Sequence, residues 1–150
     1  MNMKEDGKPT SDVGHKKVRV LLVEDQPIAA RAAMIRFDEL GCHVELAEDG
    51  KSAYELASSH QYDLILMDIG LPDISGLEVT RLIRMHESSL NKRRVPIVAL
   101  TAHAYGDIYR DCLEAAMDMV ITKPFLAKEG KKMLDKFHLI ASIKNKFKKA

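Results

Sequence analysis

Short apolar runs alternate with longer segments of helical character along most of the chain. The first run, Val18–Val23, is almost continuously apolar, which is typical of a strand buried on both faces of a sheet. The same reasoning predicts four more strands, at His43–Ala47, Asp63–Met67, Ile97–Leu100 and Met119–Thr122. The short intervals between these strands leave room only for βαβ units, which predict a parallel sheet with helices on both faces.

A helix-forming segment follows each predicted strand. These helices are expected at Ile28–Leu40, at Lys51–Ser59, from Ser75 to about Glu87, at His103–Ala115 and from Leu126 onward. Pro27 suits the first position of the first helix, and Gly41 suits the turn that ends it. Ser75 followed by Glu78 predicts a capping box. The predicted fold class is therefore α/β, a doubly wound five-stranded parallel sheet with five helices.

Composition and charge fit one domain with added segments at its ends. The chain has 150 residues, of which 46% are hydrophobic and 30% charged, so it can bury a substantial core. Its net charge is +1, but the last 23 residues carry eight lysines against two acids. We expect a disordered extension at residues 1–16, one folded domain at residues 17–142 and a basic tail at residues 143–150. The chain has no overall basic excess, so direct nucleic-acid binding is not expected.

The two cysteines and the absence of a long apolar run bear on location. Cys42 and Cys112 match no zinc-binding spacing and suggest no disulfide framework, which favours buried free thiols in a reducing compartment. No apolar run is long enough to span a membrane, and the first residues are too polar for a secretory signal. A cytoplasmic protein without a membrane partner is therefore expected.

Charged and hydroxyl side chains follow four of the five predicted strands directly. They are Glu24, Asp25, Asp68, Thr101 and Lys123. Because ligands bind at the carboxyl ends of parallel strands, these groups are expected to meet at one edge of the sheet. Three crowded carboxylates repel one another, and a hard divalent cation such as Mg²⁺ relieves that repulsion.

This set of groups suits phosphoryl transfer to a carboxylate. A carboxylate can accept a phosphoryl group when a metal and a second cation neutralise the transferring oxygens. Lys123 supplies such a cation, and Thr101 supplies a hydroxyl donor. Gly70 follows Asp68 by two residues, and its small size lets its backbone carbonyl approach a metal ion.

Four segments carry a resemblance to a known family. LLVEDQP, LILMDIGLPDISGLE, VPIVALTAHA and MDMVITKPF resemble the receiver domain of bacterial response regulators in two-component signalling, which has a flavodoxin-like fold. The resemblance covers roughly residues 18–142. It is strongest to receivers of hybrid sensor histidine kinases and extends to stand-alone single-domain response regulators. Residues 17–142 are accordingly interpreted as a receiver domain.

The resemblance implies a role for each matching position. Asp68 becomes the phosphoacceptor, Glu24, Asp25, Asp68 and the Gly70 carbonyl hold Mg²⁺, and Thr101 and Lys123 sense the phosphate. The Lys123–Pro124 bond is expected to be cis. Two positions depart from the family pattern: Val120 stands where many relatives carry an aromatic switch residue, and Ala116 stands where glycine is usual.

The function expected from the sequence is that of a signalling phosphoacceptor, not of an enzyme. A histidine kinase or a histidine phosphotransfer domain donates the phosphoryl group to Asp68, and the added charge switches a surface around residues 101–125 that binds a downstream protein. Only 27 residues follow Lys123, so no DNA-binding output module is expected after it.

Other interpretations stay open from the sequence alone. A pseudo-receiver would bind partners without phosphorylation, and Val120 is compatible with it. An aspartyl phosphatase would need an acid or base two residues after its nucleophile, where this chain has Gly70, and a dinucleotide-binding enzyme would need a glycine-rich turn where it has EDQP. Thr101 could instead cap the helix that follows it, and His103 could border the site.

Overall fold

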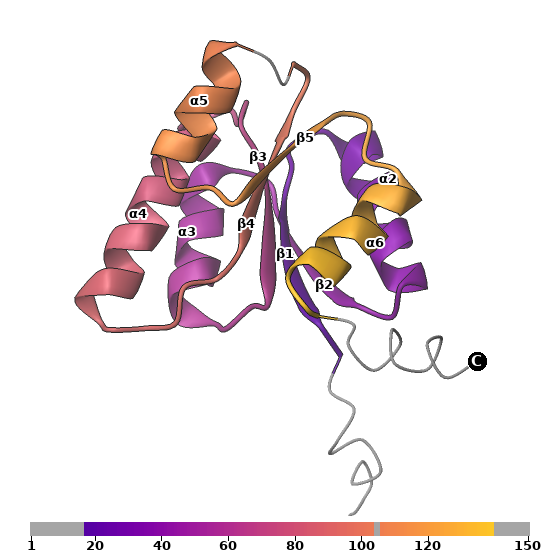
Figure 1. The fold of residues 1–150 in the computed structure, drawn as a ribbon, viewed down its shortest axis with the longest axis horizontal. Coiled ribbons are helices and arrows are strands. Elements are labelled where there is room, and N and C mark those ends of the chain that lie inside the picture. Colours follow the sequence, from indigo (N-terminus) through magenta and orange to yellow (C-terminus); the bar gives the residue numbers. More distant parts are fainter. Residues whose placement is uncertain (1–16, 104–105, 140–150) are drawn as a thin grey trace, which may run out of the picture.

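The described residues form one sheet of five parallel strands. The computed structural model describes residues 17–103 and 106–139, so the predictions for residues 1–16 and 143–150 fall outside it. The strands are β1 (Arg19–Val23), β2 (His43–Ala47), β3 (Leu64–Asp68), β4 (Ile97–Thr101) and β5 (Met119–Thr122). Their order across the sheet is β2-β1-β3-β4-β5 (Figure 1). All five predicted strands are confirmed, and β1 and β3 are neighbours.

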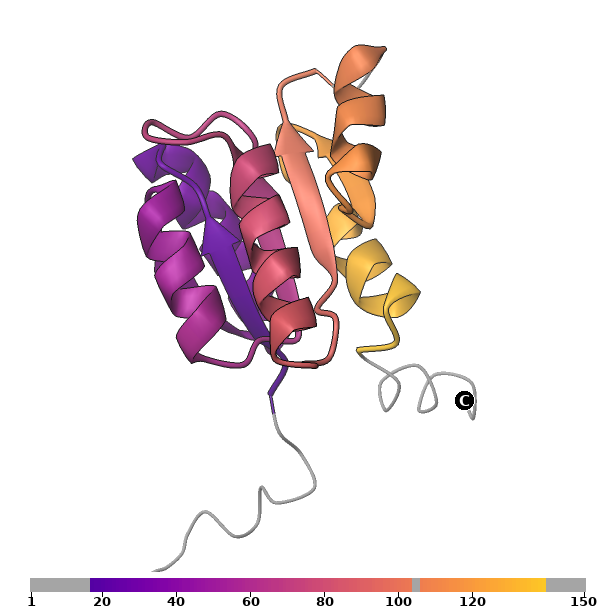
Figure 2. The same ribbon diagram turned by 90° about the vertical axis from the view of Figure 1, so that its left-hand side faces the viewer.

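Helices cover both faces of this sheet. Helices α2 (Pro27–Glu39) and α6 (Ala127–Lys136) lie on one face, and α3 (Gly50–Ser59), α4 (Gly76–Ser89) and α5 (Asp107–Glu114) lie on the other (Figure 1). Figure 2 shows the second group side by side in front of the strands. The predicted doubly wound α/β class is confirmed. None of the described helices is long and apolar enough to cross a membrane.

The continuous apolar character of β1 follows from burial on both faces. Val20 and Leu22 pack into the core on the side of α2, whereas Leu21 and Val23 pack into the core on the side of α3. All four side chains are completely buried. Burying an aliphatic side chain of this size stabilises the fold by roughly 1.5–3 kcal/mol, so these two cores fix the position of the strand ends.

Two helices on opposite faces end in the same kind of turn. After α2, Gly41 adopts a φ of +83°, and the amide of Cys42 donates a hydrogen bond to the carbonyl of Phe37 at 3.0 Å. This is the turn predicted for Gly41. After α5, the equivalent position is Ala116 with a φ of +71°, and the amide of Met117 donates back to Cys112 at 3.0 Å. An alanine therefore occupies a conformation that favours glycine.

Two predictions about helix starts were wrong in detail. The helix expected from His103 begins only at Asp107, because Gly106 before it has a φ of +61° and a ψ of −131°, outside the helical region. Thr101 is therefore not the cap of this helix. Ser75 does cap α4, but its hydroxyl oxygen accepts from the amide of Leu77 at 3.0 Å. The carboxylate of Glu78 lies 3.4 Å from Arg81 Nη1, so the capping box is not formed as predicted.

Candidate functional site

Three acidic side chains meet at the carboxyl end of two neighbouring strands. Glu24 and Asp25 follow β1, and Asp68 ends β3. One carboxylate oxygen from each lies within 4.8 Å of the other two. Glu24 is 1% exposed and Asp68 is 4% exposed, while Asp25 is half-buried. Oxygen ligands at this separation could hold a metal ion.

Lys123 reaches these acids from the last strand in the order of the sheet. It follows β5 and extends past β4, so that its Nζ lies 3.1 Å from Asp68 Oδ2 and 3.2 Å from Glu24 Oε1. Burial opposes the charge on this ammonium, but the hydrogen bond to Asp68 and the charges of both acids outweigh it and raise the pKa of Lys123. The lysine therefore stays protonated at neutral pH and offsets part of the negative charge. The peptide bond between Lys123 and Pro124 is cis.

Glu24 is held in an unfavourable environment for a carboxylate. Burial raises its pKa, the neighbouring charge of Asp68 adds to that effect, and the amide of Gln26, which donates to Oε2 at 3.1 Å, acts against it. Oε1 is buried and accepts no well-directed hydrogen bond from the described residues, its contact with Lys123 being an ion pair. A buried carboxylate oxygen without a donor is one that a divalent cation would satisfy, so the three acids fit a magnesium-type site.

The loop after Asp68 is fitted closely around this residue. The amide of Gly70 donates to Asp68 Oδ1 at 3.0 Å, which leaves Oδ2 facing Lys123. A β-carbon at Gly70 would meet only Asp68 Oδ1, at 4.0 Å, so the space there does not require glycine. The backbone amide, present in almost any residue, makes the contact.

Gly76 is the residue that the sequence analysis missed. A β-carbon at this position would lie 2.3 Å from the backbone oxygen of Asp68 and 3.0 Å from the α-carbon of Ile69. Its amide donates to the Ile69 carbonyl at 2.9 Å, which closes the loop on itself. The sequence gives no local signal for this role, because it depends on contact between Gly76 and the backbone of Asp68.

Thr101 lies at the same carboxyl end of the sheet, at the end of β4, but its side chain forms hydrogen bonds with the loop that follows it. Its hydroxyl donates to the carbonyl of His103 at 3.1 Å and accepts from the His103 amide at 3.2 Å. The Thr101 side chain is buried, and the side chain of His103 is exposed. Val120 pairs with Ala99 of β4 and is half-buried against the core under α3, α4 and α5.

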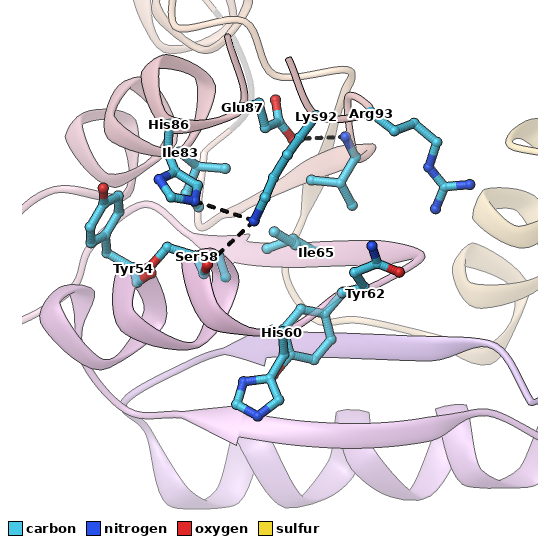
Figure 3. Close-up of a pocket in the computed structure, with 13 residues that line it drawn as sticks. Tyr54, Ser58, His60, Tyr62, Ile65, Ile83, His86, Glu87, Lys92 and Arg93 are labelled. Carbon is cyan, nitrogen blue, oxygen red and sulfur yellow. Dashed lines mark hydrogen bonds between the residues drawn. The ribbon is translucent and has the colours of Figure 1, made fainter. Parts of the chain in front are cut away.

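A second hollow lies at the opposite end of the sheet, between α3 and α4. It has a volume of about 360 Å³ and is bordered by the residues that precede β3 and β4 (Figure 3). Lys92 extends across it, and its ammonium donates to the carbonyl of Ser58 and contacts His86 Nε2, both at 3.4 Å. A cation at the carboxyl end of α3 is favourable with the helix dipole, and the hollow does not reach the three acids.

Comparison with known proteins identifies the family of this chain. The sequence profile of the response regulator receiver domain matches residues 20–135. The chain belongs to this receiver family. Among characterised relatives of this receiver, the sensor protein GacS of Pseudomonas syringae pv. syringae is 37% identical over 106 residues, and histidine kinase 1 of Arabidopsis thaliana is 34% identical over 140 residues. Each alignment covers 71% of this chain and 12% of the kinase, so the receiver spans about an eighth of these relatives.

Solved structures show the same receiver fold. The receiver domain of the sensor histidine kinase PA1611 from Pseudomonas aeruginosa PAO1 has a TM-score of 0.74 at 39% identity, covering 81% of this chain and 98% of that one, and it contains a magnesium ion coordinated in its active-site cleft. The response regulator TrrA from Thermotoga maritima, solved in complex with Mg²⁺ and BeF, has a TM-score of 0.68 at 32% identity, covering 80% and 98%.

Proposed function

We propose that this receiver domain accepts a phosphoryl group on Asp68 from a histidine kinase or a histidine phosphotransfer domain. The observation that carries the proposal is the position of the Asp68 carboxylate, which lies between two further acids and the ammonium of Lys123. Relatives of this domain are histidine kinases, which supports a donor of that class. Mg²⁺ would be held by Glu24, Asp25, Asp68 and the backbone carbonyl of Gly70.

The chemistry is a displacement at phosphorus. An oxygen of Asp68 forms the new O–P bond while the P–N bond to the donor imidazole breaks, and the imidazole nitrogen takes up a proton. Lys123 neutralises a transferring oxygen, and the metal, when bound, offsets the charge on the carboxylates and the phosphoryl group. Burial of Asp68 strengthens these charge interactions, since water screens them poorly at this site.

Phosphorylation would be read out through Thr101. Its hydroxyl holds the backbone of His103, so a turn of the Thr101 side chain toward a phosphoryl oxygen releases that contact and the start of the following loop. We propose that the surface around residues 101–125 changes in this way and binds a downstream protein. The side chain of Val120 carries no ring, so this route does not depend on an aromatic switch.

The direct test is phosphorylation by a small donor. The protein is incubated with acetyl phosphate and Mg²⁺, and intact mass is measured. We expect one added phosphoryl group on the wild-type chain and none on Asp68→Asn, which keeps the shape of the side chain but removes the nucleophilic carboxylate. Chelation of Mg²⁺ with EDTA is expected to prevent the addition.

Two other outcomes point to different functions. Absence of the added group under all conditions would favour a pseudo-receiver that binds partners without phosphorylation, which Val120 supports. Continued release of phosphate from unrelated phosphate esters would favour an enzyme.

We also propose a cytoplasmic location. Cys42 and Cys112 are both buried free thiols, as the sequence predicts, and burial raises the pKa of Cys42 to about 11. Unreactive free thiols are compatible with a reducing compartment.

A further inference from the structure

Asp73 links the loop after the proposed phosphoacceptor to a helix elsewhere in the chain. It lies five residues after Asp68, between β3 and α4. Its Oδ1 accepts a hydrogen bond from the amide of Gly50 at 2.7 Å, and its Oδ2 accepts from the amide of Lys51 at 2.9 Å. These are the first two amides of α3, which have no partner within the helix. Charge-assisted bonds of this kind are about twice as strong as neutral ones.

The close approach of the loop to α3 depends on a glycine. A β-carbon at Gly50 would lie 2.5 Å from Ile74 Cγ1 and 2.8 Å from Val79 Cγ2. The backbone of α3 therefore packs directly against the loop that carries Asp73. At its other attachment, the loop is closed by the hydrogen bond from Gly76 to Ile69. The loop at residues 69–75 is thus fixed at two separate places.

We propose that Asp73 is a positioning residue for phosphoryl transfer to Asp68. This inference rests on the proposed function. The amide of Gly70 lies within the same loop and orients the Asp68 carboxylate at 3.0 Å, and the carbonyl of Gly70 is the expected metal ligand. By holding the loop against α3, Asp73 keeps both groups of Gly70 in place. Residues that orient ligands in this indirect way typically affect affinity or activity by about 10–100-fold.

A second acid at the same helix end provides a matched control. Asp49 precedes α3, and its Oδ1 accepts from the amide of Ser52 at 2.7 Å. Asp49→Ala and Asp73→Ala therefore remove the same carboxylate charge from the amino end of the same helix. Only Asp73 belongs to the loop that follows Asp68. Loss of helix stability is common to both variants, whereas loss of loop position is specific to Asp73→Ala.

The experiment compares three variants of the full chain with the wild type. For Asp73→Ala, Asp73→Asn and Asp49→Ala, we would measure the Kd for Mg²⁺ by calorimetry, the rate of phosphorylation by acetyl phosphate at saturating Mg²⁺, and stability by urea denaturation. We expect Asp73→Ala to weaken Mg²⁺ binding and to slow phosphorylation, each by about 10-fold. Asp73→Asn should be intermediate, because its amide oxygen can accept from only one of the two amides well. Asp49→Ala should lower stability but leave both functional values near those of the wild type.

Specific outcomes would overturn the inference. Wild-type values of Kd and rate for Asp73→Ala, or equal losses in Asp49→Ala, would show that Asp73 stabilises α3 and does nothing further. Failure of acetyl phosphate to phosphorylate the wild type would instead overturn the proposed function. In that case the Kd for Mg²⁺ still decides whether Asp73 positions the loop at the metal site.

Discussion

The backbone of Gly76 lies directly against the carbonyl oxygen of Asp68, so that a β-carbon at position 76 would sit 2.3 Å from that oxygen. Neither partner can move easily, because Asp68 belongs to a buried strand and Gly76 begins a helix. We predict that Gly76→Ala destabilises the fold by about 2 kcal/mol through this overpacking. Urea denaturation monitored by circular dichroism measures the change.

Gly70→Ala is the control for this prediction. Its β-carbon would make only an ordinary contact with Asp68 Oδ1 at 4.0 Å, so a change within about 0.5 kcal/mol is expected. Equal stability of Gly76→Ala and the wild type would mean that the loop and the strand are not packed as described.

The second prediction concerns the cost of the Glu24 charge. Burial raises the pKa of Glu24 above its ordinary value of 4.5, so the folded state binds the proton more tightly than the unfolded state. Ionised Glu24 therefore lowers stability at neutral pH, and this cost disappears as the pH falls below 4.5. We expect Glu24→Gln, measured without metal, to be more stable than the wild type by about 1 kcal/mol or more at neutral pH.

The pH profile of the free energy of unfolding checks this sign. The advantage of Glu24→Gln should shrink toward acidic pH. Glu78→Gln serves as the control, because Glu78 is exposed and its one ion pair among the described residues, with Arg81 at 3.4 Å, is a surface pair, so the change should stay within about 0.5 kcal/mol throughout. A Glu24→Gln protein that is less stable than the wild type at neutral pH would contradict the prediction.

The third prediction concerns stabilisation by Mg²⁺. A ligand that binds only the folded state stabilises it, by about 1.4 kcal/mol at a concentration ten times its Kd. We expect added MgCl₂ to raise the Tm relative to NaCl at equal ionic strength. Asp25→Asn should abolish this rise while leaving the Tm without metal nearly unchanged, since Asp25 is only half-buried. An equal rise in Asp25→Asn and the wild type would place Mg²⁺ elsewhere on the molecule.

The fourth prediction concerns the turn that ends α5. Ala116 has a φ of +71°, a conformation that costs an alanine roughly 1–2 kcal/mol. We expect Ala116→Gly to stabilise the fold by about 0.5–1 kcal/mol, because the relief of strain exceeds the entropy that glycine adds to the unfolded chain. Ala32→Gly, at an exposed position inside α2, should instead destabilise by about 1 kcal/mol. Thermal denaturation of both variants tests the contrast, and loss of stability in Ala116→Gly would argue against it.

The sequence predicted the strands and the clustering of Glu24, Asp25, Asp68 and Lys123 because both depend on short-range patterns. A continuous apolar run and the polar residue that ends it are visible locally, and strand ends in a parallel sheet converge by geometry. The start of α5 and the role of Gly76 were not predicted. Both depend on backbone conformation or on contact between segments, as in the φ of Gly106 and the approach of Gly76 to Asp68. The hydrogen bonds that the first amides of α3 donate to Asp73 join residues more than 20 apart, and no local pattern contains them.

Lys123 is attached to an edge strand. Among the strands that the structure describes, β5 pairs with β4 alone, and yet the ammonium of Lys123, which follows β5, reaches Asp68 at the end of β3 and Glu24 just after β1. A protein that bound along β5 and displaced the strand by a fraction of an ångström would alter the electrostatics of the acidic cluster directly. If binding of that protein changes the affinity of the acidic cluster for a ligand, thermodynamic reciprocity requires that the ligand changes the affinity for the protein by the same factor. Binding of a partner at β5 and binding of a ligand at the acidic cluster can thus be coupled through the position of Lys123.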